Sequence, residues 1–101
     1  MILELADIRI HPGQQSEFEK AVQVGLETTI AKAVGFRRFE VRHSIESAER
    51  YVIQILWDTL EDHTIGFRGS PAMAQWRGIV GGFFAQPPMV EHFELVAASL
   101  N

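Results

Sequence analysis

The stretch RYVIQILWDTLEDH occupies residues 50–63 and indicates most of the architecture. Residues 50–58 are rich in β-branched and aromatic side chains, which is typical of a strand, and Thr59 begins a helical pattern that ends before Gly69. Both faces of the strand are largely apolar, one formed by Tyr51, Ile53, Ile55 and Trp57 and the other by Val52, Gln54 and Leu56. We therefore expect helices to cover one face and a further surface to cover the other.

Patterns on both sides of this stretch predict the remaining elements. A run with charges at alternating positions leads to the turn signal at residues 11–13, and Ser16 with Glu19 has the capping-box spacing of a helix start. Pro71 follows Ser70 at another helix start, and Pro87-Pro88 prevents that helix from continuing. We predict strands over 2–10, 36–43, 50–58 and 89–96, and helices over 17–34, 59–68 and 71–83.

This order, β-α-β-β-α-α-β, predicts an α+β fold of the ferredoxin-like type with a four-stranded antiparallel sheet. Helices then cover one sheet face only. Leu3 and Leu5 make the opposite face of the first strand apolar as well, so we expect a second copy of the chain to bury it in a homodimer. Three residues that alternate on one face of strand 36–43 fit a lattice of ion pairs across that interface: Arg38, Glu40 and Arg42.

Composition narrows the classes of function. The 101 residues form one domain, 1–101, and a net charge of −4 with 22% charged residues argues against a nucleic-acid partner. No cysteine is present, which excludes disulfides and Cys-ligated metals. The N-terminus lacks an export signal, and the uncharged run 78–90 is too short to span a bilayer. We expect a soluble, cytoplasmic protein with no membrane partner.

Several segments, in the right order along the chain, resemble a known family. They are 10–13 (IHPG), 34–36 (VGF), 51–57 (YVIQILW), 59–63 (TLEDH) and 70–73 (SPAM). With these residues the chain resembles the antibiotic biosynthesis monooxygenase family of dimeric α+β barrel proteins, over almost its whole length. The resemblance implies a cytoplasmic homodimer with an apolar pocket between sheet and helices in each subunit.

The resemblance also implies a chemistry, the oxidation of a small hydroxylated aromatic compound, such as a quinol or an anthrone, by dioxygen without a cofactor. A deprotonated aromatic of this kind can reduce dioxygen itself, so the protein needs a base, hydrogen-bonding partners and a dry cavity. The sequence has neither a phosphate-binding glycine loop nor a dinucleotide fingerprint. Haem is not expected, since Ala6 (or Asp7), Gly66 and Trp76 stand where the haem-degrading branch has asparagine, tryptophan and its histidine ligand.

His63 is the candidate catalytic residue, as base or hydrogen-bond partner, because helical spacing puts it on one face with Leu60 and Phe67. A semi-buried histidine that only bonds a neighbouring group has the same spacing. The candidate substrate-binding residues are aromatic, although aromatic residues so spaced also occur in plain cores: Trp57, Phe67, Trp76 and Phe83. His11 and His92 lack the spacing of metal ligands, so no metal site is expected.

Two functions remain open on this sequence. One is a monooxygenase with dioxygen and a small aromatic molecule as partners. The other is a non-catalytic dimer, associated with stress or ligand binding, that uses the same pocket as a receptor. Oxygen consumption in the presence of quinols and anthrones separates them, because a receptor binds without consuming oxygen.

Overall fold

Four antiparallel strands form one sheet in the order β2-β3-β1-β4 in the computed structural model, which describes residues 1–100. The strands are β1 (Ile2–Arg9), β2 (Phe36–His43), β3 (Arg50–Trp57) and β4 (Met89–Glu94). β1 and β3 occupy the centre and pair along their full length, from Ile2 with Trp57 to Arg9 with Arg50. The predicted α+β fold with a four-stranded antiparallel sheet is confirmed.

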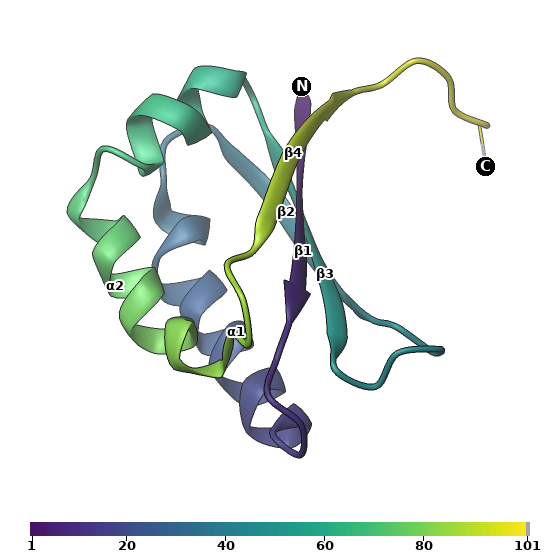
Figure 1. The fold of residues 1–101 in the computed structure, drawn as a ribbon. Helices are drawn as coiled ribbons and strands as arrows, with labels where there is room; N and C mark the ends of the chain where they lie inside the picture. The colour runs from purple at the N-terminus through teal and green to yellow at the C-terminus, as the bar shows by residue number, and fades with distance from the viewer. Residues whose placement is uncertain (101) are drawn as a thin grey trace.

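All helical segments lie on one side of this sheet, as Figure 1 shows. They are α1 (Gln15–Thr28), the 3-10 turn η1 (Ile30–Lys32), the π-helix η2 (Asp62–Phe67), α2 (Pro71–Val80) and the 3-10 turn η3 (Gly81–Phe83). Within the described residues, no helix covers the other face of the sheet (Figure 1). No helix within residues 1–100 combines the length and apolar character needed to cross a bilayer.

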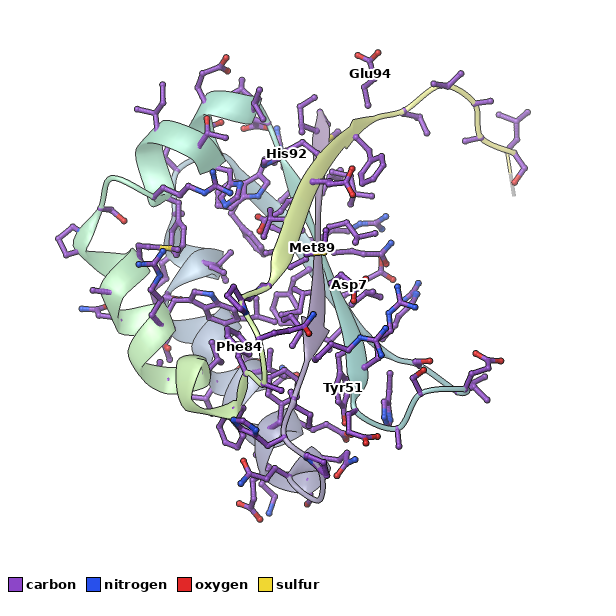
Figure 2. All side chains as sticks on the ribbon, in the orientation of Figure 1. Asp7, Tyr51, Phe84, Met89, His92 and Glu94 are labelled. Carbon is purple, nitrogen blue, oxygen red and sulfur yellow. The ribbon has the colours of Figure 1, made fainter. Side chains whose placement is uncertain are left out.

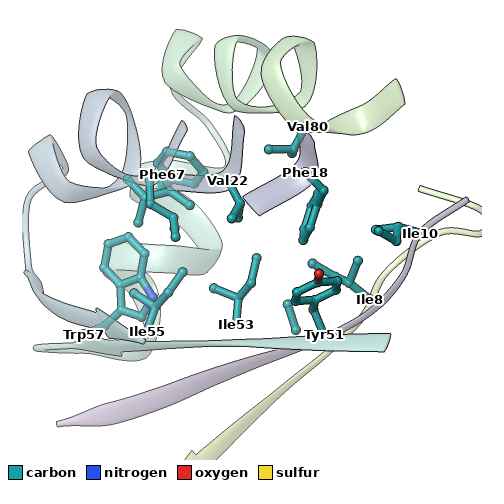
Figure 3. Packing of buried hydrophobic residues seen from close by; sticks show 13 residues of the cluster. Ile8, Ile10, Phe18, Val22, Tyr51, Ile53, Ile55, Trp57, Phe67 and Val80 are labelled. Carbon is teal, nitrogen blue, oxygen red and sulfur yellow. The ribbon is translucent and has the colours of Figure 1, made fainter. Parts of the chain in front are cut away.

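The core lies between the sheet and α1, and it uses the strand face predicted to point inward. Tyr51, Ile53, Ile55 and Trp57 rise from β3 toward the helices in Figure 3 and are fully buried. Phe18 of α1 packs on the Tyr51 ring, with the two ring centroids 4.8 Å apart. Burying such large side chains is the main stabilising contribution to a domain of this size.

Several boundaries differ from the prediction. The helix predicted over 17–34 ends at Thr28, because the hydroxyls of Thr28 and Thr29 donate to main-chain oxygens four residues back and a 3-10 turn follows. The predicted capping box is wrong, since Gln14 is the N-cap and Glu19 instead accepts a 2.6 Å hydrogen bond from the Tyr51 hydroxyl. The last strand ends at Glu94, two residues earlier than predicted.

The uncovered sheet face combines apolar side chains with ion pairs. Phe93 and Met89 on β4 are 46% and 65% exposed, and Leu3, Leu5, Val52 and Leu56 point to the same side in the strand register. Asp7 also faces away from the helices (Figure 2) and pairs with Arg50 at 2.8 Å. Glu40 lies between Arg38 and Arg42, at 4.0 and 3.1 Å. No segment within residues 1–100 covers this face.

Candidate active site

A cavity of about 520 Å³ opens between the helix-facing side of the sheet and the segments η2 and α2. Its floor is apolar and consists of Ala6, Ile8, Ile53 and Ile55. Met73 and Trp76 of α2 line the opposite side, and Phe84, Pro88 and Val90 close one flank. This size and lining suit a small organic molecule.

Four polar side chains interrupt this apolar lining: Arg68, Arg77, Glu4 and His63. Glu4 and His63 are the buried pair, only 6% and 4% exposed. Glu4 Oε1 accepts a 2.9 Å hydrogen bond from Trp57 Nε1 and lies 3.3 Å from His63 Nε2. Both of these contacts engage Oε1, and within residues 1–100 no hydrogen bond reaches Oε2 of this cavity-lining side chain.

A second imidazole completes the arrangement from the edge of the sheet. His92 Nε2 lies 2.8 Å from His63 Nδ1, at hydrogen-bond distance. When Glu4 is ionised it can only accept, which favours a proton on Nε2 of His63. Nδ1 is then an acceptor for the Nε2–H of His92, and both ring nitrogens of His63 have partners.

Burial and a nearby cation set the protonation states of these groups. Burial raises the pKa of the Glu4 carboxyl, against the lowering effects of the Trp57 N–H and of Arg68. Burial, Arg68 and His92 together lower the pKa of His63 to about 4, so its contact with Glu4 joins a neutral imidazole to a carboxyl group. A carboxylate with a raised pKa is a stronger base than one at the surface.

Aromatic rings hold His63 in place. The Trp57 ring stacks on the imidazole with centroids 5.3 Å apart and an angle of 17°, and Phe67 lies on the same π-helix with its centroid at 6.4 Å. The wide π turn closes with a hydrogen bond from the Arg68 N–H to the His63 carbonyl, five residues back. π turns occur frequently at functional sites.

The sequence matches the antibiotic biosynthesis monooxygenase family over residues 1–78. A structure from Bordetella bronchiseptica that is assigned to this family is 34% identical, with a TM-score of 0.90 over 95% of this chain and 97% of that one. This chain belongs to the antibiotic biosynthesis monooxygenase family. YczJ of Bacillus subtilis strain 168 is 34% identical over 94 residues, or 93% of this chain and 98% of YczJ. SnoaB, a cofactor-independent oxygenase from Streptomyces nogalater, shares the fold at a TM-score of 0.83 and 13% identity, over 99% of this chain and 97% of SnoaB.

The structure places the predicted site residues of this family member in two groups. His63, Phe67 and Trp76 line the cavity together. Trp57 lies outside the lining, because it is fully buried behind His63 and donates to Glu4. Phe83 also lies outside it and packs edge-on against Phe18 at 5.7 Å, while its neighbour Phe84 faces the cavity.

The sequence analysis missed two residues of the site, Glu4 and His92. A signal for Glu4 existed, since it stands at the inward position of an alternation with Ile2, Ala6 and Ile8, where a charge is unusual. His92 had no comparable signal, because its approach to His63 depends on the pairing of β4 with β1. Within residues 1–100, no group of three or more His, Asp or Glu side chains has an arrangement that could hold a metal ion.

Close packing behind the cavity fixes the position of Trp76. A Cβ added at Gly25 of α1 would lie 2.9 Å from Cζ3 and 3.0 Å from Cε3 of the indole. α1 and α2 therefore pack together with the Trp76 indole in contact with Gly25. The position of one side of the cavity in this family member depends on that glycine.

Proposed function

We propose that this protein is a cofactor-independent monooxygenase that oxidises a small hydroxylated aromatic compound, of the quinol or anthrone kind, in the cavity described above. The observation that supports it best is the buried Glu4 carboxylate, with no hydrogen bond to Oε2, in a largely apolar cavity that Arg68 and Arg77 also line. The family and the oxygenase activity of the structurally similar SnoaB favour the same reaction. The site combines a base of raised pKa with a largely apolar space.

In the proposed reaction, Glu4 Oε2 takes the proton of a substrate hydroxyl and breaks its O–H bond. His63 keeps its N–H toward Glu4, and Phe67 and Trp76 contact the planar ring. The resulting anion is oxidised by dioxygen. One oxygen atom forms a bond to a substrate carbon, and the other leaves as water with two hydrogens of the substrate. The substrate supplies all four electrons, so the reaction balances without a bound cofactor.

Oxygen uptake tests this proposal directly. We expect the purified protein to consume one dioxygen per quinol or anthrone oxidised, at a rate proportional to protein concentration, and to place one ¹⁸O atom from ¹⁸O₂ in the product. Boiled protein is the control for spontaneous oxidation. Quinols or anthrones that raise the melting temperature of the protein without any oxygen uptake would contradict the proposed enzyme activity and favour the receptor function.

We further propose that the chain works as a homodimer joined through the uncovered sheet face. Phe93, Met89 and the leucines of β1 leave on that face an apolar area of the kind that marks an interface. The alternating charges of Arg38, Glu40 and Arg42 would then pair across a two-fold axis.

Sedimentation at micromolar concentration should give twice the chain mass of 11.4 kDa. Arg38→Glu replaces a cation by an acidic group beside Glu40 on this face and should weaken the dimer about tenfold or more. Lys20→Glu makes the same charge change on the exposed side of α1 and should leave the dimer intact. A stable wild-type monomer, or equal effects of the two variants, would contradict this interface.

A further inference from the structure

His92 belongs to β4, at the edge of the sheet, and does not line the cavity. Its register partner on β1 is Glu4, so the two side chains stand on the same face of adjacent strands. The His92 ring is half-buried, and its centroid lies 5.0 Å from that of His63. Figure 2 shows His92 on the last strand, beside the helical segment that follows β3.

Each hydrogen-bonding atom of His63 thus has one partner, and the two partners come from different strands. Nε2 faces Glu4 of β1, and Nδ1 faces His92 of β4. The field of Arg68 acts on all three groups, and Arg77 of α2 also lines the cavity that Glu4 and His63 face. β3 contributes the uncharged Trp57. An imidazole that bonds a donor at one nitrogen must present its own proton at the other.

We propose that His92 is a positioning residue for Glu4, which acts by donating to His63 Nδ1 and so keeping the proton of His63 on Nε2. This inference rests on the proposed function, in which Glu4 is the base. The opposite tautomer would aim a lone pair at Glu4 Oε1, and the carboxyl would then keep a proton of its own to donate. Glu4 would no longer accept the substrate proton. His92 therefore sets the state of a base that it does not touch.

Nitrogen NMR of the histidine rings tests the tautomer without any need for turnover. In ¹⁵N-histidine-labelled wild-type protein at pH 7 we expect His63 to carry its proton on Nε2, with an Nδ1 signal typical of a hydrogen-bond acceptor. His92→Leu should give a mixture of the two tautomers. His92→Gln retains an N–H donor and should restore the wild-type state. A wild-type proton on Nδ1, or an unchanged His63 spectrum in His92→Leu, would overturn the proposal.

Kinetics give the second measurement. His92→Leu should lower kcat/KM about tenfold and move the acidic limb of its pH profile to higher pH, because Glu4 then holds its proton more tightly. His92→Gln should keep both wild-type values, a rescue that a purely structural loss does not produce. Wild-type kcat/KM and pH profile in His92→Leu would contradict the positioning role. Absence of oxygen uptake in wild type refutes the proposed function, and the NMR result still judges the tautomer.

Discussion

Glu4→Gln should reduce the turnover of an accepted quinol about a thousandfold, within the range that general-base catalysis contributes. Glutamine has the shape of glutamate and can still accept from Trp57 Nε1, but its amide cannot take the substrate proton. The free energy of unfolding at pH 7 should be unchanged or higher, because the variant no longer buries an ionised carboxylate. Oxygen uptake and urea denaturation on the same preparation measure both quantities.

Glu46→Gln is the matched control, since it removes the same charge from the exposed turn between β2 and β3. This control should retain wild-type turnover. Full activity in Glu4→Gln would remove Glu4 from the chemistry. Loss of activity together with loss of the folded state would identify Glu4 as a structural group instead.

Acid should destabilise the wild-type protein relative to His63→Gln between about pH 6.5 and 4. The pKa of His63 falls from an ordinary 6.5 to about 4 on folding, so its contribution to stability is present above pH 6.5 and is lost as the pH falls to about 4. The largest possible difference is about 3 kcal/mol. Glu4, whose raised pKa acts in the opposite direction, is present in both proteins. Urea denaturation at half-unit pH intervals measures the difference.

His11→Gln is the control here, because it removes an imidazole from the exposed turn before α1. Parallel pH profiles for wild type and His63→Gln would show that His63 protonates as easily in the folded chain as in the unfolded one. That result would contradict the burial of a neutral imidazole between Trp57 and Glu4.

The strands could be predicted from the sequence because their signal is local. In residues 51–57, side chains two positions apart lie on the same face of the strand, so the alternation of the sequence defines the two faces. The structure buries the face of Tyr51, Ile53, Ile55 and Trp57. The end of α1 could not be predicted in this way, since Thr28 and Thr29 fit the helical spacing, and the helix ends where their hydroxyls donate to the main-chain oxygens of Val24 and Gly25.

The candidate site was predictable in part for a related reason. Spacing alone placed His63 and Phe67 on one helical face, and both line the cavity. Glu4 and His92 lie 59 and 29 positions from His63 in the sequence, so strand pairing and the π turn bring them together. The π turn itself depends on a hydrogen bond between residues five positions apart, and side-chain periodicity gives no indication of such a bond.

The glycine beneath Trp76 makes the width of the pocket adjustable from a position outside its lining. Any larger residue at position 25 must either drive the indole toward the sheet or separate the two helices, since its Cβ would meet the ring at 2.9 Å. The first response narrows the slot for a planar molecule, and the second widens it. Under the proposed function, this one position on α1 therefore controls which aromatic skeletons fit, while Glu4, His63 and His92 keep their geometry.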